Sequence, residues 1–350
     1  MIKERNCGID LLRLILMYMI CILHVLGQGG ILANSPIGSI RYSIFWLMEI
    51  FSFCAVDAFA IISGYVASNK PCKYEKLIKI WFKVFFYSFI ITIFFVLVGK
   101  ANNIGKIDII KNFFPITFER YWYMTSYFLL FLTMPILNKY LFKINKKTAK
   151  KLFIIIIIIF TIMGLFEDPF KTMKGYSAIW LIVLYCVGVL ANKIDIFGKK
   201  KSITLIIIWL FLVFVTWYSY VHFETKLFLK YTSPTVLFCG LILVILFKRL
   251  KIKSNTIIKI ASLSLGIYLF QLNQVIWENY IGSRFAFIVN KKLYIAIPYI
   301  LLIALVICFA GLVVEFIRSK LEKIIKLDLL SKKIINIIDN ILVKLSNCLK

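Results

Sequence analysis

Apolar runs of about 18 residues recur along the chain, from a first one that begins at Ile9 to a last one that ends at Ile317. An α-helix needs a run of this length to cross the hydrocarbon core of a bilayer. A transmembrane β-barrel would show short segments of alternating polarity instead. Hydrophobic residues make up 61% of the chain, against roughly 45–50% in an average soluble domain. The sequence therefore predicts an all-α, polytopic membrane helix bundle.

We predict about ten transmembrane helices in one domain over residues 1–317, followed by a tail over 318–350. The predicted spans are 9–26, 44–66, 77–98, 121–142, 151–166, 176–191, 203–221, 234–247, 257–278 and 293–317. The first run lacks a small-residue cleavage site, so we expect it to remain as a span. In the tail, apolar residues recur on one helical face with lysines between them, which predicts a basic amphipathic helix on the inner leaflet.

The net charge of +27 would also suit a nucleic-acid-binding protein, but the placement of the basic residues favours a membrane. Alternate loops between the spans hold 15 Lys and Arg in 38 residues, whereas the other loops hold 12 in 74 residues. The positive-inside rule makes the denser set cytoplasmic, together with both termini. We expect anionic lipids as partners of these lysines, and no nucleic acid.

The cysteines show no spacing typical of a metal site or of a disulfide framework. They are Cys7, Cys21, Cys54, Cys72, Cys186, Cys239, Cys308 and Cys348. Most of them fall within predicted spans or cytoplasmic segments, so we expect free thiols. Two histidines and dispersed cysteines do not make a ligand set, and no metal cofactor is predicted.

The first span carries two ionisable side chains, Arg13 and His24, that are unusual in a membrane. Eleven residues bring a helix to within about 20° of three full turns, so both side chains share one face, about 16–17 Å apart along the axis. Arg13 would lie near the cytoplasmic end and His24 near the outer end. Two simpler interpretations remain open: a snorkelling arginine paired with Asp10, and a histidine hydrogen-bonded at the interface.

The second span runs in the opposite direction and adds further polar residues. Glu49 is expected at the depth of His24, where it would orient the ring, and Asp57 near mid-membrane, where it would pair with Arg13. Alternatively, Glu49 simply reaches the outer interface. The Ser63-Gly64-Tyr65 segment is expected near the depth of Arg13, as part of a ligand site or as a small-residue packing motif.

These residues predict a polar shaft through the bundle. An arginine at the inner mouth suits a phosphate-bearing ligand, because the guanidinium fork matches phosphate oxygens. A histidine at the outer mouth suits general base catalysis, because its pKa lies near neutrality. An extended acyl-coenzyme A, with phosphates at one end and a thioester at the other, fills such a gap. Ser63 and Tyr65 would contact the coenzyme beside Arg13.

The chain resembles the acyltransferase family 3 membrane proteins, which include O-acetyltransferases of bacterial surface polysaccharides. The resemblance covers roughly residues 6–320. It is carried by "RLILMYMICILH" with Arg13 and His24, "ISGYV" at 62–66, "KIWFKVFFYSF" at 79–89, "YWYMTSYFLLFLTMPILN" at 121–138 and "YSAIWLIVLYCVGVLANK" at 176–193. It departs from many relatives at Gln271, where they have histidine, and at Asp57, where they have asparagine.

This resemblance implies an acyltransferase of the bacterial plasma membrane. The acyl group, usually acetyl, would come from cytoplasmic acyl-coenzyme A and pass to a hydroxyl of a cell-envelope or exported polysaccharide, or of a lipid-linked sugar. It implies that Arg13 and His24 are the essential pair and that Trp122 lines the acceptor pocket; an interfacial aromatic anchor is the alternative for Trp122. Two rival functions fit the same architecture, a transporter for a polysaccharide or lipid-linked sugar and a non-catalytic membrane sensor.

Overall fold

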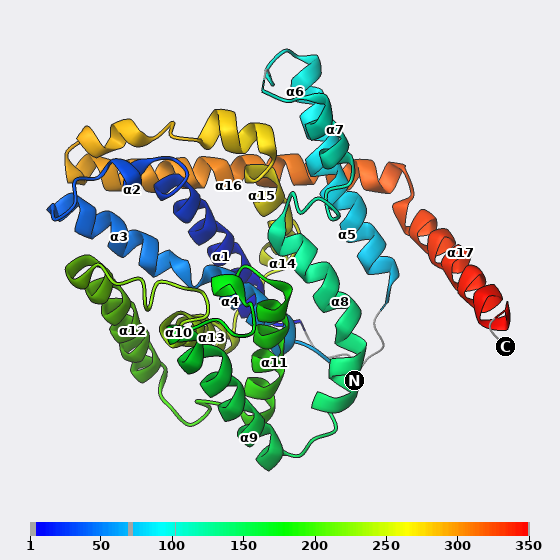
Figure 1. The fold of residues 1–350 in the computed structure, drawn as a ribbon, viewed down its shortest axis with the longest axis horizontal. Coiled ribbons are helices and arrows are strands. Elements are labelled where there is room, and N and C mark those ends of the chain that lie inside the picture. Colours follow the sequence, from blue (N-terminus) through cyan, green and yellow to red (C-terminus); the bar gives the residue numbers. More distant parts are fainter. Residues whose placement is uncertain (1–4, 69–72, 102, 349–350) are drawn as a thin grey trace.

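The computed structural model describes residues 5–68, 73–101 and 103–348, and the regular secondary structure in these ranges is helical throughout (Figure 1). In chain order the elements are α1 (Cys7–Leu26), α2 (Ile31–Asn34), α3 (Ile40–Phe53), α4 (Ala55–Tyr65), α5 (Glu75–Phe85), the π-helix η1 (Phe86–Ile90), α6 (Ile91–Leu97), α7 (Lys106–Phe113), α8 (Trp122–Leu141), α9 (Lys146–Ile157), the π-helix η2 (Ile158–Ile162), α10 (Met163–Phe166), the 3-10 helix η3 (Met173–Gly175), α11 (Ala178–Ile194), α12 (Ser202–Phe223), α13 (Pro234–Lys248), α14 (Asn255–Ala261), α15 (Ser264–Gln271), the π-helix η4 (Ile276–Ile281), the 3-10 helix η5 (Ala286–Asn290), α16 (Leu293–Ile324) and α17 (Leu327–Cys348). No strand occurs among the described residues, and the predicted helical class is confirmed.

Helix α1 forms the buried centre of the bundle. The side chain of Asn6 caps it by accepting a hydrogen bond of 3.0 Å from the Ile9 amide. Most of its residues are buried, because α3, α4, α13, α14, α15 and α16 all pack against it. A helix enclosed by protein in this way can carry polar side chains toward an interior cavity rather than toward lipid.

Helices α4 and α11 approach each other unusually closely through two glycines. A Cβ on Gly64 would lie 1.9 Å from the carbonyl oxygen of Tyr185, and one on Gly188 would lie 2.3 Å from that of Ile61. No larger residue fits at either position without moving a backbone. The small-residue packing interpretation of the 63–65 segment therefore holds for Gly64.

The sequence predicts ten spans, but the lengths and the apolar character of the observed helices support a smaller number. Six helical segments of the described chain are long and apolar enough to cross a membrane, and one bent pair would make a seventh. Helices α11 and α13 are apolar but have only 17 and 15 residues. Several apolar helices nevertheless make this a multi-pass membrane protein, and the number ten stays a prediction.

The predicted span over 257–278 is not one continuous helix, which corrects the sequence-based expectation. Its two parts, Asn255–Gln271 and Ile276–Asn290, are bent by 78° relative to each other. Asn273 explains the break. Its side-chain oxygen accepts a hydrogen bond of 3.1 Å from the Val275 amide, while its amide nitrogen donates to the Tyr87 carbonyl at 2.8 Å. A side chain that bonds local backbone groups in this way ends one helix and starts the next.

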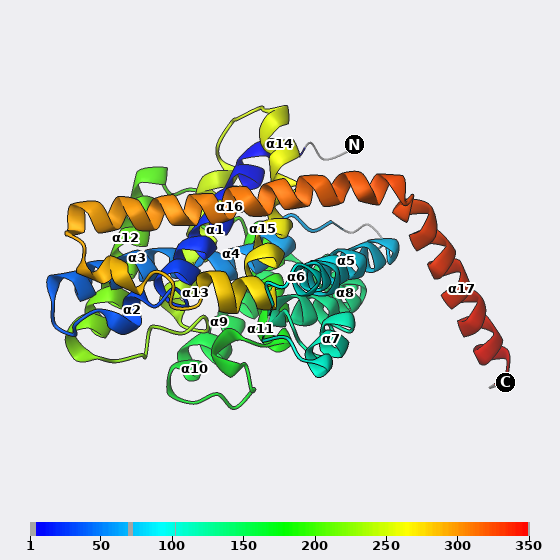
Figure 2. The same ribbon diagram turned by 90° about the horizontal axis from the view of Figure 1, so that it is seen from above.

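The last span extends past its predicted end at residue 317, because α16 continues to Ile324. Glu315 and Arg318, both buried, form a bond of 2.8 Å, and the Nζ atom of Lys83 on α5 approaches Glu315 at 2.8 Å. These pairs let a charged segment stay helical and packed. The predicted tail helix is α17, which begins at Leu327 and turns away from the bundle (Figure 2).

Candidate active site

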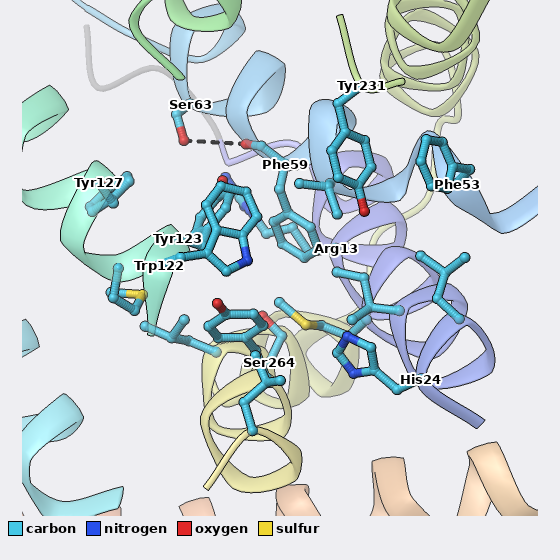
Figure 3. A pocket seen from close by; sticks show the side chains of 18 of the residues that line it. Arg13, His24, Phe53, Phe59, Ser63, Trp122, Tyr123, Tyr127, Tyr231 and Ser264 are labelled. Atoms are coloured by element: carbon cyan, nitrogen blue, oxygen red, sulfur yellow. Dashed lines mark hydrogen bonds between the residues drawn. The ribbon is translucent and has the colours of Figure 1, made fainter. Parts of the chain in front are cut away.

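A cavity of about 660 Å³ opens inside the bundle beside α1, between α3, α4, α8, α14 and α15. This volume falls in the range of about 300–1,000 Å³ typical of small-molecule sites. Its wall includes Arg13, His24, Glu49, Ser63 and Trp122. Figure 3 shows Arg13, His24 and Trp122 around one space. The structure thus brings together most of the side chains selected from the sequence.

Arg13 and His24 both come from α1 and both face this cavity. Their spacing of eleven residues corresponds to about 16–17 Å along the helix axis. The cavity therefore connects a basic group near the beginning of α1 with an imidazole near its end. A long ligand that enters it can contact both residues at once.

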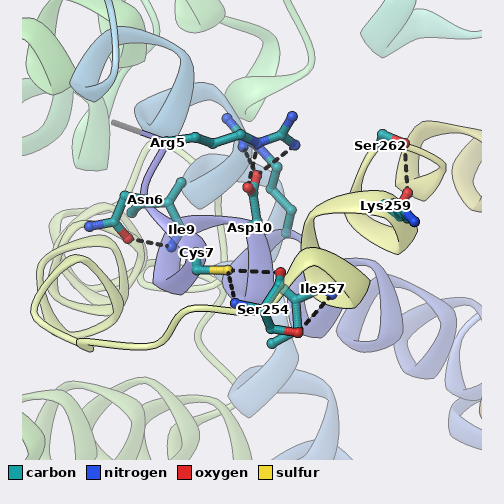
Figure 4. A network of polar contacts seen from close by, with 10 residues as sticks. Arg5, Asn6, Cys7, Ile9, Asp10, Ser254, Ile257, Lys259 and Ser262 are labelled. Carbon is teal, nitrogen blue, oxygen red and sulfur yellow. Dashed lines mark hydrogen bonds and ion pairs between the residues drawn. The ribbon is translucent and has the colours of Figure 1, made fainter. Parts of the chain in front are cut away.

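A second arginine, which the sequence analysis did not select, stands beside Arg13. The carboxylate of Asp10 is fully buried and accepts from Nη1 of Arg13 at 2.6 Å and from Nε of Arg5 at 2.5 Å (Figure 4). Both arginines line the cavity. One carboxylate thus holds two guanidinium groups, which leaves an excess of positive charge at this end.

The predicted pair between Asp57 and Arg13 is wrong. The indole Nε1 of Trp180 on α11 donates to Oδ1 of Asp57 at 3.0 Å, and both side chains are fully buried. Asp57 is absent from the cavity wall, and Arg13 has Asp10 as its partner instead. Asp57 therefore joins α4 to α11 rather than contributing charge to the cavity.

Ser63 and Tyr65 lie in different surroundings although the sequence grouped them. Ser63 lines the cavity and donates to the carbonyl oxygen of Phe59 at 3.3 Å. Tyr65 is buried away from the cavity, with the ammonium of Lys248 5.0 Å from the centre of its ring. The expected contact between Tyr65 and the coenzyme is therefore corrected, because the side chain faces α13.

His24 is positioned by neighbours other than the predicted Glu49. Its ring packs perpendicular to that of Trp277, with 4.8 Å between the ring centres. Neither Nδ1 of His24 nor Oε2 of Glu49 has a hydrogen-bond partner among the described residues. The expectation that Glu49 orients His24 is not met, and a nitrogen of the imidazole is left available.

Aromatic rings form a continuous part of the cavity wall. Ring centres lie 4.8 Å apart for Trp122 and Tyr176, 5.1 Å for Tyr176 and Tyr231, and 4.4 Å for Tyr231 and Phe53. We call these four residues the aromatic wall. Only Trp122 was selected from the sequence, and Tyr176 lies within a stretch that carried the family resemblance. Tyr231 sits in a loop with no helical pattern to reveal it.

The start of α8, and with it Trp122, is fixed from two sides. The hydroxyl of Tyr121 donates to the carbonyl oxygen of Leu269 on α15 at 3.2 Å. Arg120 bonds Asp108 of α7 at 2.8 Å, and this hydrogen bond holds the pKa of Asp108 below its ordinary value of 3.8. The ion pair lies outside the membrane-spanning segments. It anchors α7 to the chain just before the first residue of α8.

The described residues contain no cluster of three or more His, Cys, Asp or Glu side chains that would hold a metal. Six cysteines lie in the described part of the chain without a disulfide partner. Cys72 and the side chain of Cys348 lie outside the described residues. The side chains that line the cavity include arginine, histidine, carboxylate and aromatic groups.

Comparison with known proteins agrees with this geometry. The profile of a family described as "Acyltransferase domain" matches residues 6–313, which is most of the 350-residue chain. Neither a curated protein nor a solved structure matches it significantly. The matched region begins just before α1 and ends within α16, so it contains the cavity wall apart from Arg5. The chain belongs to the acyltransferase family 3 of integral membrane acyltransferases.

Proposed function

We propose that this membrane acyltransferase is an O-acyltransferase that moves an acyl group, usually acetyl, from acyl-coenzyme A to a hydroxyl of a cell-envelope or exported polysaccharide or of a lipid-linked sugar. One observation carries the proposal: a single cavity has arginine at one end and histidine at the other. This arrangement suits a donor with phosphates at one end and a reactive thioester at the other.

The arginine end is proposed to bind the phosphates of the coenzyme. Arg5 and Arg13 offer two guanidinium groups fixed by one buried carboxylate. Because each guanidinium presents donors in a rigid fork, the pair can take phosphate oxygens without first ordering flexible side chains. Ser63 supplies a hydroxyl further along the wall.

His24 is proposed to act as the general base. Its ring nitrogen takes the proton of the acceptor hydroxyl while the hydroxyl oxygen attacks the thioester carbonyl carbon. The carbon–sulfur bond then breaks, and the proton passes to the coenzyme sulfur, so an ester and a free thiol result. In the covalent alternative, His24 first takes the acyl group from the thioester and then passes it to the acceptor hydroxyl.

The topology supports a plasma-membrane location with both termini in the cytoplasm. On the predicted topology the lysine-rich loops lie on the side where α1 begins, and acyl-coenzyme A would enter there beside Arg5 and Arg13. The acceptor would then reach His24 and Trp122 from the opposite side. Lysines of α17 would contact anionic lipids of the inner leaflet.

The test is transfer of labelled acetyl from acetyl-coenzyme A to envelope glycan in membranes that contain the wild type or His24→Ala at equal expression. The loss of a general base typically costs about 10²–10⁴-fold in rate. The control is His222→Ala, because His222 packs on Tyr218 at 4.5 Å, away from the cavity. Equal transfer by wild type and His24→Ala would contradict the proposal. Absent transfer combined with lost glycan export would favour the transporter.

A further inference from the structure

Glu49 carries a carboxyl group for which the described residues supply no counter-charge. It lines the cavity, its Oε2 atom is buried without a hydrogen-bond partner, and no ion pair among the described residues includes it. An ionised carboxyl in such a place is costly unless a positive group pairs with it. A cationic ligand that enters the cavity would supply this group and stabilise the ionised form.

The surroundings of Glu49 suit a positive charge. Tyr176 and Tyr231 line the same cavity as Glu49, and their ring centres lie 5.1 Å apart. Together with Trp122 and Phe53 they form the aromatic wall defined above. Aromatic faces attract ammonium groups within about 6 Å, and the attraction grows when the site excludes water.

The two parts of the cavity differ in their charged groups. Arg5 and Arg13 give one part an excess of positive charge, whereas Glu49 lies in another part and becomes its negative group when a cation binds beside it. Three residues of the aromatic wall come from the segments just before α11 and α13 and from the start of α8, and Phe53 ends α3. In an alternating bundle these starts lie on the side where α1 ends, which is the side of His24.

We infer, on the basis of the proposed acyl transfer, that the acceptor carries an ammonium group, which pairs with Glu49 against the aromatic wall while a neighbouring hydroxyl is presented to His24. An amino sugar or an aminoacyl-substituted glycan has this chemistry. The amine is held as a cation and cannot attack the thioester, so the acyl group goes to oxygen. Neutral sugars lack the paired charge and bind more weakly.

Binding to the detergent-purified full chain tests this without relying on turnover. The probes are benzyltrimethylammonium, which is permanently charged, and neopentylbenzene, its neutral analogue of the same shape. We expect the cation to bind at least about tenfold more tightly to the wild type. Glu49→Gln should remove this preference, whereas Glu49→Asp should keep part of it. Equal binding of the two probes, or a preference unchanged in Glu49→Gln, would overturn the inference.

The matched control is Glu278→Gln, which removes an exposed carboxylate that does not line the cavity. It should leave the preference intact, and a loss there would overturn the assignment to Glu49. Binding of coenzyme A to each variant reports whether it is folded. A Glu49→Gln protein that binds coenzyme A but has lost the preference supports the inference.

Acetyl transfer to two soluble acceptors, methyl glucosaminide and methyl glucoside, separates this inference from the proposed function. The wild type should acetylate the glucosaminide with the higher kcat/KM, by about tenfold or more, and the product should be an alkali-labile ester. Equal kcat/KM values, or an alkali-stable amide, would overturn the inference and leave acyl transfer standing. No transfer to any acceptor, envelope glycan included, would instead count against acyl transfer itself.

Discussion

Asp10 is completely buried and accepts a hydrogen bond of 2.6 Å from Arg13, so the guanidinium that borders the cavity is fixed by its own helix. Asparagine at position 10 would leave Arg5 and Arg13 side by side without a counter-charge. Breaking a fully buried ion pair on one side typically costs about 3–5 kcal/mol, and the cost is smaller here because the side chains of Arg13 and Arg5 are 28% and 50% exposed. Asp10→Asn should therefore lower the melting temperature in detergent.

The control for this prediction is Asp328→Asn, which removes an exposed carboxylate that pairs with Lys79. Exposed pairs contribute little to stability, because water and salt screen them. If both variants melt within a degree or so of the wild type, Asp10 does not hold the two arginines in the manner described.

Arg13→Lys keeps the charge at the cavity end but removes the planar fork. We expect the KM for acetyl-coenzyme A to rise by about tenfold with a smaller change in kcat, because a charge-assisted hydrogen bond is worth about 1.5–3 kcal/mol. Steady-state kinetics at saturating acceptor measure both constants. A lower kcat at unchanged KM would place Arg13 in the chemical step instead of in donor binding.

Trp180→Phe removes the indole N–H that donates to Oδ1 of Asp57, while it keeps an aromatic ring. The carboxyl group would be left buried without its partner, and this typically costs about 1–3 kcal/mol, more when the group is charged. Stability should therefore fall while the KM for the donor stays constant, since neither residue lines the cavity.

Trp217→Phe is the comparison for Trp180→Phe. It loses a bond of 2.9 Å from the indole to the carbonyl oxygen of Ser43, which involves no charge. The loss of stability should be smaller, about 0.5–1.5 kcal/mol. A larger effect at Trp217 than at Trp180 would contradict the role assigned to Asp57.

The ion pair between Asp108 and Arg120 predicts a pH dependence. The hydrogen bond from Arg120 lowers the pKa of Asp108 below its ordinary 3.8. The pair therefore stabilises the fold above pH 3.8, and this contribution is lost as the pH falls through the lowered folded-state value. At pH 7 the free energy of unfolding of Asp108→Asn should be lower than that of the wild type by at most about 1 kcal/mol. The variant should therefore melt at a slightly lower temperature, and this difference should vanish in acid. A difference that persists at pH 2 would contradict this.

Local helical geometry made part of the site predictable from the sequence. Arg13 and His24 belong to one helix, so their shared face follows from the turn angle alone. The cavity does contain both, together with Glu49 and Ser63. Residues within one regular element can be related without knowing the rest of the fold.

Contacts between distant segments were beyond that reasoning. Asp57 was expected at Arg13, yet its partner Trp180 comes 123 residues later in the chain, where nothing in the spacing reveals it. Arg5 was missed because it precedes α1 and has no helical register. The break at Asn273 depends partly on the carbonyl of Tyr87 in η1, which only the packed structure brings to Asn273.

The most direct test of the central claim is the structure of the detergent-purified protein with coenzyme A bound, determined by electron cryomicroscopy. One cavity is expected to hold the whole ligand, with phosphates within about 3 Å of the Arg5 and Arg13 guanidinium nitrogens. The thiol should point toward His24. Coenzyme A bound outside this cavity, or with its phosphates at the His24 end, would contradict the claim that α1 joins donor binding and catalysis along one face.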